Sequence, residues 1–371
     1  MVGLLAILVM SCAADQPPEV TRPGTVLVDR DARRVALAAM PPAQRDAWCA
    51  VPAGLGDPAP VAALRVLADG PDNAGEPFAL DIMLGAAAAL AGDRAAAASL
   101  ARLLKRWAGA NALARIEQPT ANTYYALGRV LLPTIVAFAI VRDDPSLEPA
   151  ARERVRAWLE RLVEARRPPR ADEVTARNNH HYLRGSVDAA WGALVGDDAR
   201  FRGGLAAYRD AIATMRPDGS LPLETRRGAR ALWYQRHAIA SLVVIAEIAA
   251  AQGVDLYGYG VDGRDLHLGI RFLLDGIDVP SRVWPYAAAN EKPGPQPDYT
   301  LQDLTFLDPR GHGRHYMAWA EIYVARFPRR PESRRLLALL ARAGPGFRPM
   351  IDDYSGGNTT CLFARPAAPG S

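Results

Sequence analysis

Apolar residues recur at helical spacing along most of the chain, and Pro, Gly and Asp fall between the apolar segments. Strictly alternating runs of β-branched or aromatic residues are scarce, so the pattern predicts an all-α protein. Many antiparallel helices with short connections predict a bundle or a toroid whose helix ends define one rim. We place the helices at 28–40, 78–91, 94–108, 120–141, 147–165, 179–195, 199–215, 227–251, 264–276, 312–327 and 332–343.

The region 26–365 contains no linker and no change of composition, so we expect it to form a single domain. Two stretches in it, 53–77 and 277–300, are rich in Pro, Gly and Asp. Such stretches are typical of mobile loops, and one of them would suit a lid over a binding site.

Residues 1–14 carry a short apolar run followed by small residues, which is typical of a secretory signal peptide. The run is too short to span a membrane as a finished helix. Cys12 closes a segment, Val9-Met10-Ser11-Cys12, that also resembles a lipoprotein processing box. We therefore expect a periplasmic or secreted protein, whose only membrane contact would be a lipid anchor at Cys12.

Removal of the signal leaves two cysteines, Cys49 and Cys361, one near each end of the chain. An oxidising compartment would permit a disulfide between them, worth about 5 kcal/mol on the loop-entropy model. Two unpaired buried thiols are the alternative. The wide spacing carries no metal-binding pattern.

The net charge of +4 and the pI near 9 are modest. Arginine supplies most of the positive charge, and because its guanidinium group binds planar carboxylates with two parallel hydrogen bonds, an acidic substrate is favoured. No Gly-rich phosphate loop, zinc-finger spacing or basic aromatic motif is present, so we expect no nucleic-acid partner.

Two polar patches stand at the starts of otherwise apolar helical segments. The first is Asn178-Asn179-His180-His181-Tyr182, and the second runs from the turn at Pro217-Asp218-Gly219-Ser220 to Tyr234. Amides, imidazoles, guanidinium groups and a phenol in these positions indicate a cleft rather than core.

The groups in the two patches fit one chemical problem. Removing the proton next to a carboxylate requires neutralisation of that carboxylate, a base for the proton and an acid for the leaving oxygen. Asn179, His180, Arg227 and Tyr234 can supply these parts without a metal or a cofactor. If the helix has already begun at Arg227, Arg227 and Tyr234 lie on the same face of it, and Arg230 lies one turn below Tyr234. A guanidinium group next to a phenol stabilises the phenolate form of that phenol.

Simpler interpretations of the same residues stay open. An Asn-Asn-His sequence is often only a helix cap, and an arginine cluster is usually solvated. Asp218 resembles a turn residue, and Glu224 resembles a charged residue at a helix N-terminus. The adjacent imidazoles of His180 and His181 point about 100° apart on a helix and do not form a metal site. Two further functions remain: a glycoside hydrolase that depends on Glu224 or Asp188, and a non-catalytic polyuronate-binding protein.

At these residues the chain resembles the alginate lyases of polysaccharide lyase family five and their relatives. The resemblance covers roughly residues 95–250 and includes the 54-residue step from His180 to Tyr234 and the seven-residue step from Arg227 to Tyr234. It rests on Asn178-Asn179-His180, Tyr182, Asp218-Gly219-Ser220-Leu221-Pro222-Leu223-Glu224, Arg226-Arg227, Arg230-Ala231-Leu232, Tyr234 and Ala238, with weaker matches at Lys105-Arg106-Trp107-Ala108 and Gly356-Gly357-Asn358-Thr359.

The resemblance implies an (α/α) toroid, or incomplete α/α barrel, that cleaves a 1,4-linked polyuronate by β-elimination. Asn179 and Arg227 would neutralise the C5 carboxylate with help from His180. Tyr234 would protonate the glycosidic oxygen and, for mannuronate, would also act as base, whereas His180 would be the base for guluronate.

The chain departs from the family pattern around Tyr234, where Trp233 precedes it and Gln235-Arg236-His237 follow. These changes affect the choice of sugar more than the reaction, so polymannuronate is the first expectation and glucuronan, or another glucuronate polymer, the second. We expect a monomer. The candidate substrate-binding residues are Arg230, Trp233, Tyr125 and His181.

Overall fold

A computed structural model of the chain describes residues 17–52, 56–64, 75–117, 119–166, 174–292, 294–342, 344 and 346–366. The signal peptide expected at 1–14, including Cys12, and much of the stretch 53–77, one of the two candidate lids, lie outside these residues. The α-helices are α1 (Arg30–Ala38), α2 (Pro42–Cys49), α3 (Gly75–Leu90), α4 (Arg94–Gly109), α5 (Ala121–Val141), α6 (Pro149–Ala165), α7 (Asn179–Val195), α8 (Asp198–Thr214), α9 (Pro222–Thr225), α10 (Ala231–Ala251), α11 (Leu266–Asp278), α12 (Trp284–Ala287), α13 (Trp319–Arg326), α14 (Pro331–Ala341) and α15 (Thr359–Phe363).

Short 3₁₀ helices and strands complete the described part of the chain. The 3₁₀ helices are η1 (Gly228–Arg230), η2 (Pro280–Arg282), η3 (Thr305–Leu307), η4 (Gly311–Gly313) and η5 (Asp353–Ser355). The strands form two small pairs, β1 (Ala63–Leu64) with β2 (Arg115–Ile116) in parallel and β3 (Ile351–Asp352) with β4 (Gly357–Asn358) in antiparallel orientation.

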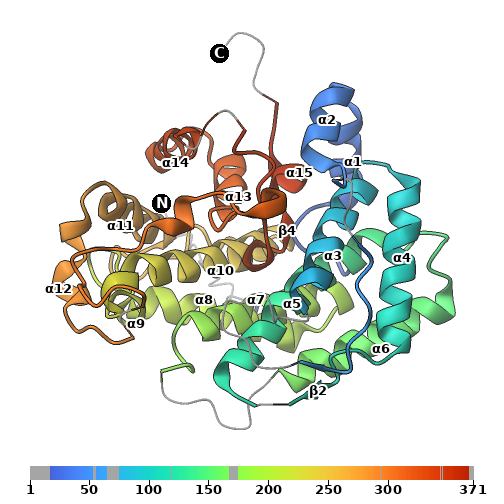
Figure 1. The fold of residues 1–371 in the computed structure, drawn as a ribbon, viewed down its shortest axis with the longest axis horizontal. Helices are drawn as coiled ribbons and strands as arrows, with labels where there is room; N and C mark the ends of the chain where they lie inside the picture. The colour runs from blue at the N-terminus through green and yellow to red at the C-terminus, as the bar shows by residue number, and fades with distance from the viewer. Residues whose placement is uncertain are drawn as a thin grey trace, which may run out of the picture.

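The helices form two concentric layers, which confirms the predicted toroid (Figure 1). Successive inner helices α3, α5, α7, α10 and α13 pack against one another, and α4, α6, α8, α11 and α14 pack outside them. The inner helices α5 and α10 are buried along nearly their whole length, as expected of helices that are apolar all round. By length and composition α5 would pass as a membrane span, but 83% of its apolar window is buried inside the fold.

Short side chains and caps fix how the two layers meet at α7 and α8. Asn178 caps α7, Gly196 ends it in the left-handed conformation and Asp197 caps α8. A Cβ at Gly204 would lie 2.5 Å from the backbone nitrogen of Ala189, so only glycine allows this approach of the two helices.

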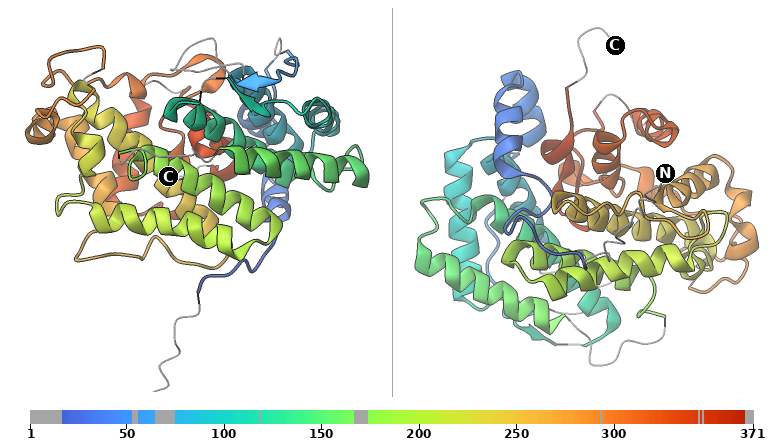
Figure 2. Two further views of the ribbon diagram at one scale, coloured as in Figure 1. Left: turned by 90° about the horizontal axis from the view of Figure 1, so that it is seen from below. Right: turned by 180° about the vertical axis from the view of Figure 1, so that it is seen from behind.

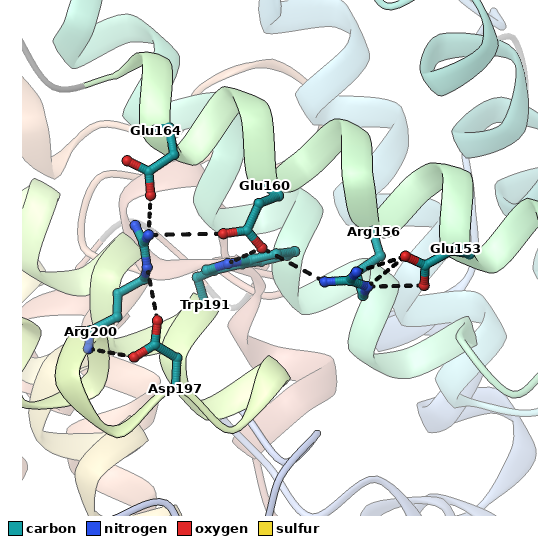
Figure 3. Close-up of polar contacts among 7 residues, drawn as sticks. All are labelled: Glu153, Arg156, Glu160, Glu164, Trp191, Asp197 and Arg200. Atoms are coloured by element: carbon teal, nitrogen blue, oxygen red, sulfur yellow. Dashed lines mark hydrogen bonds and ion pairs between the residues drawn. The ribbon is translucent and has the colours of Figure 1, made fainter.

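On the outer surface, ion pairs join α6 to α8 and a hydrogen bond joins α6 to α7 (Figure 3). Arg200 of α8 binds Glu164 of α6, and its Nη2 lies 3.9 Å from Glu160 Oε1. The indole nitrogen of Trp191 on α7 donates to Glu160 Oε2 at 3.2 Å. Such half-exposed pairs orient helices more than they stabilise them.

The C-terminal segment returns to the start of the chain and closes the ring. β4 packs on α3, η5 packs on α5 and α10, and α15 contacts α2. Figure 2 shows the N-terminal helices beside the C-terminal elements in both views. A disulfide joins Cys49 at the end of α2 to Cys361 in α15, so the two cysteines pair rather than remain free thiols.

Three of the predicted elements differ from the structure. The stretch 227–251 is not one helix, because η1 precedes α10, which begins at Ala231. The stretch 277–300 is not an unstructured loop, since it holds the end of α11 together with η2 and α12. The stretch 312–327 is helical only from Trp319. Short helices such as α2, α9 and α15 escape detection because two turns or fewer carry little periodicity.

Candidate active site

The candidate site lies where the N-terminal ends of three inner helices meet. Tyr125 is in the second turn of α5, Asn179 and His180 open α7, and Tyr234 lies in the first turn of α10. Tyr125 contacts Asn179 and His180 directly, and His237 links it to Tyr234, because the His237 ring lies 5.7 Å from the Tyr234 ring and its Nδ1 3.2 Å from the Tyr125 hydroxyl. Because a helix N-terminus carries partial positive charge and free N–H groups, three of them together favour an anionic ligand.

Asn179 and His180 are held in place by Tyr125. The Asn179 amide nitrogen donates to the Tyr125 hydroxyl at 2.9 Å. The imidazole of His180 stacks on the Tyr125 ring, with 4.2 Å between the ring centroids. Asn178, not Asn179, makes the predicted cap, because its Oδ1 accepts from the backbone nitrogen of His180 at 2.9 Å. The cap therefore leaves the Asn179 side chain for the site.

Arg227 lies directly over Tyr234. The guanidinium carbon is 3.8 Å from the centroid of the phenol ring. Arg227 is buried, whereas Tyr234 is only partly buried. The sequence predicted this proximity for the wrong reason, since Arg227 precedes η1 and is not part of the helix that carries Tyr234.

Glu224 supports the first residue of α7. Its Oε1 accepts from the backbone nitrogen of Asn179 at 2.6 Å, so it acts at the N-terminus of α7 rather than of its own short helix. Burial raises the pKa of Glu224 to about 7, against the opposing effects of Arg227 and of the Asn179 N–H. A carboxyl group in this position holds the backbone of Asn179 by a hydrogen bond and does not face a glycosidic bond.

His237 and Tyr354 pack against Tyr125. His237 Nδ1 lies 3.2 Å from the Tyr125 hydroxyl, and the rings of His237 and Tyr354 are 4.6 Å apart. Burial, with Arg236 and other arginines nearby, lowers the pKa of His237 well below its usual value. Burial raises the pKa of Tyr125 well above its usual value.

The predicted substrate-binding residues divide into two groups. Tyr125 lies within the cluster, and Trp233 borders it, with its ring 6.1 Å from that of His237. The Nε of Arg230 lies 3.5 Å from Asp303 and its guanidinium carbon 5.6 Å from the Trp233 ring. Arg230 ends η1 and immediately precedes α10, and its role in substrate binding stays a prediction.

His181 lies apart from the candidate site. Its Nε2 is 3.1 Å from Asp210 of the outer helix α8. The helical step of about 100° that separates adjacent residues turns His180 toward Tyr125 and His181 toward α8. The structure gives no support to substrate binding by His181.

Sequence reasoning missed the charged groups beneath the site. Arg129, one turn after Tyr125 on α5, pairs with Asp353 at 2.8 Å. Arg236 is fully buried and donates to the Tyr316 carbonyl at 3.1 Å. Burial and the neighbouring carboxylate of Asp353 raise the pKa of Asp352, against the opposing charge of Arg236. Charged residues inside the most apolar helices were the available signal, since such residues are rarely buried without a partner or a function.

The carboxylates proposed for a hydrolase do not flank a common space. Asp188 pairs with Arg166 and lies 3.6 Å from Arg200 Nη1 on the outer side of α7, while Glu224 is bound to Asn179.

Among the described residues, no three His, Cys, Asp or Glu side chains gather as a metal site would require. A cavity of about 640 Å³ lies at the other end of α10, against Glu247, Ala250 and Ala251.

The fold and the site define an all-α toroid with a cluster suited to anionic ligands. The family model described as alginate lyase matches residues 72–284, more than half of the chain. The chain therefore belongs to the alginate lyase family.

Relatives of known sequence agree with this membership. A polysaccharide lyase of Stenotrophomonas maltophilia strain K279a is 36% identical over 166 residues, which are 45% of this chain and 50% of that protein. An alginate lyase of Pseudomonas syringae pv. syringae strain B728a is 31% identical over 194 residues, 48% of this chain and 43% of that protein. The chain thus spans about half the length of the relatives it matches.

Solved structures extend the similarity to nearly the whole fold. Alginate lyase A1-III from Sphingomonas species A1 superposes with a TM-score of 0.77 at 27% identity, covering 94% of this chain and 98% of that protein. An alginate lyase from Bacteroides ovatus has a TM-score of 0.58 at 15% identity and covers 91% of this chain and 92% of its own, which supports the fold alone.

Proposed function

We propose that this protein is a polysaccharide lyase that cleaves a 1,4-linked polyuronate by β-elimination, with polymannuronate as its first substrate. The observation that carries the proposal is Arg227 over the ring of Tyr234, in one cluster with Asn179 and His180. This arrangement offers a positive charge, an amide donor, an imidazole and a phenol at the N-termini of three helices. Those are the groups that elimination next to a carboxylate requires.

In the proposed reaction, Arg227 and Asn179 bind the C5 carboxylate of the uronate, and His180 assists them. The phenolate of Tyr234 takes the C5 proton, and the electrons of the C5–H bond form the C4–C5 double bond. The C4–O bond breaks, its electrons leave on the glycosidic oxygen, and Tyr234 returns the proton to that oxygen. In guluronate, the proton lies on the opposite side of the ring: neutral His180 removes it, and Tyr234, as the neutral phenol, donates its proton to the glycosidic oxygen.

Two solved structures of one relative support this assignment of roles. Alginate lyase A1-III has been solved with tetrasaccharide in a histidine-to-alanine variant and in a tyrosine-to-phenylalanine variant. The histidine and the tyrosine substituted there are 54 positions apart, the same separation as between His180 and Tyr234.

Glucuronan is the second candidate substrate. The residues that would carry out elimination do not distinguish mannuronate from glucuronate, whereas Trp233, at the border of the cluster, is a departure from the family pattern. Hydrolysis is less favoured, since neither Glu224 nor Asp188 is placed to flank a glycosidic bond.

The test is the ultraviolet absorbance of the C4–C5 double bond with polymannuronate, polyguluronate, glucuronan and hyaluronan, each as a separate substrate. We expect the fastest rise with polymannuronate, a rise at least about 10²-fold slower with Tyr234→Phe, and an unchanged rate after treatment with a metal chelator. New reducing ends without absorbance would indicate a hydrolase. Binding of a polymer without either product would indicate a polyuronate-binding protein, and a rate abolished by the chelator would contradict metal independence.

A further inference from the structure

We propose that His237 is a positioning residue that fixes Tyr125 and, through it, both Asn179 and His180. This inference rests on the proposed function and adds a residue to its machinery. Its starting point is the continuous set of contacts from His237 Nδ1 to the Tyr125 hydroxyl (3.2 Å) and from that hydroxyl to the Asn179 amide (2.9 Å).

The donors around the Tyr125 oxygen determine the direction of the hydrogen bonds. An amide nitrogen can only donate, so the Tyr125 oxygen accepts from Asn179. The Tyr125 hydroxyl also carries one proton, and His237 Nδ1, 3.2 Å away, is placed to accept it.

This arrangement requires a neutral His237 with its proton on Nε2. The charged form would carry a proton on Nδ1 as well, and could then no longer accept the Tyr125 proton. The surroundings also oppose that charge, because His237 is buried and faces Arg129, Arg227, Arg236 and His180. Its other neighbours are the rings of Tyr125, Trp233, Tyr234, Tyr316 and Tyr354.

Fixing Tyr125 orients both groups that would meet the substrate. One N–H of the Asn179 amide is held by Tyr125, and the second N–H is left for a carboxylate. The Tyr125 ring sets the plane of His180, since the two rings stack at 27°. A positioning error of about 1 Å in such groups is enough to slow catalysis severely.

The kinetic experiment compares His237→Phe, His237→Asn and a control. Phenylalanine keeps the ring but removes the acceptor, so we expect kcat to fall at least about tenfold with a smaller change in KM. Asparagine offers an acceptor at the position of Nδ1 and should restore most of kcat. His267→Phe is the matched control, because His267 is a buried histidine on α11, away from the site, whose Nδ1 lies 2.7 Å from the hydroxyl of Tyr323 on α13. It should lower Tm and leave kcat unchanged.

A double-mutant cycle tests whether His237 acts through Tyr125. In a Tyr125→Phe background, His237→Phe should have no further effect on kcat. Independent, additive effects of the two substitutions, or an unchanged kcat in His237→Phe, would overturn the proposal.

The ring nitrogens of His237 give a readout that needs no activity. With ¹⁵N-labelled histidine, nuclear magnetic resonance of the wild-type protein should show the neutral Nε2–H form at pH 6, assigned by its absence in His237→Phe. A proton on Nδ1 would overturn the proposal. If the wild type cleaves none of the four polymers, the proposed function fails, while this spectrum still decides the geometry of His237.

Discussion

The guanidinium carbon of Arg227 lies 3.8 Å from the ring centroid of Tyr234, although the helix that carries Tyr234 begins only at Ala231. The 3₁₀ turn η1 separates the two residues and folds Arg227 back over the phenol. The pair therefore depends on the conformation of a loop rather than on the register of a helix. Its geometry can be disturbed without unfolding α10.

Tyr234→Phe and His180→Ala should each lower kcat at least about 10²-fold, the usual size of an acid–base contribution. Phenylalanine retains the contact with Arg227 but cannot exchange a proton. The measurement is the initial rate of double-bond formation on polymannuronate. His181→Ala is the control, since His181 faces Asp210, and it should keep a near-normal rate. Near-normal turnover in both site variants would refute the assignment of these two residues.

Arg227→Lys should also lower kcat/KM by about 10²-fold, although the charge is kept. Lysine presents a point charge in place of a planar fork, so it cannot bind a carboxylate through two parallel bonds or lie flat on the Tyr234 ring. Arg226→Lys, next to it in the sequence, is the matched control, because Arg226 is exposed and pairs with Glu291. A near-normal kcat/KM in Arg227→Lys would mean that charge alone, not the planar geometry, matters.

Glu224→Gln should make folding stability less dependent on pH. Burial raises the pKa of Glu224 from 4.5 to about 7, so the folded state holds this proton more tightly than the unfolded chain. The wild type is therefore most stable, with respect to this group, below pH 4.5 and loses about 3 kcal/mol as the pH rises to 7.

Glutamine carries no charge and can still accept from the Asn179 N–H. At pH 7.5 we expect the variant to exceed the wild type in free energy of unfolding, with the gap closing by pH 4. Denaturant titrations at both pH values measure the two gaps. Identical pH profiles in the two proteins would show that Glu224 titrates normally.

Reduction of the Cys49–Cys361 disulfide should destabilise the protein, because the bond links residues 312 positions apart. On the loop-entropy model its loss costs about 5 kcal/mol. The check is Tm with and without reductant, and in Cys49→Ser/Cys361→Ser. The reductant should not shift the Tm of the double variant. Equal Tm values for the oxidised wild type and the double variant would contradict the prediction.

Gly204→Ala should cost about 1–3 kcal/mol by overpacking α7 against α8, since the new Cβ would meet the Ala189 nitrogen and the Gly185 carbonyl oxygen, each at 2.5 Å. Gly203→Ala, one position earlier on α8, has no atom within 4 Å of the new Cβ. Because alanine favours a helix more than glycine does, that control should be neutral or stabilising. Similar free energies of unfolding for the two variants would argue against close packing here.

Most of the helical framework was predictable from the sequence, for reasons visible at individual boundaries. The predicted 179–195 coincides with α7, because Asn178 is a strong N-cap and Gly196 a strong terminator. By contrast, the stretch 227–251 was read as one helix, since nothing in Arg227-Gly228-Ala229-Arg230 distinguishes a 3₁₀ turn from the first turn of an α-helix. The catalytic candidates Asn179, His180, Arg227 and Tyr234 follow from their residue types and spacing, and the structure brings them together.

The tertiary structure decided which of the neighbouring polar residues belong to the site. His180 and His181 are equivalent candidates in the sequence, but rotation along α7 directs one to Tyr125 and the other to Asp210. His237, Arg129 and Tyr354 come from α10, α5 and the C-terminal 3₁₀ turn η5, far apart in sequence. Local periodicity and capping depend on residues within one or two turns, so the sequence by itself determined the helices and the chemical character of the two patches. Contacts between segments more than a hundred residues apart depend on how whole helices pack, and only the assembled fold could place His237 beneath Tyr125 and Cys361 beside Cys49.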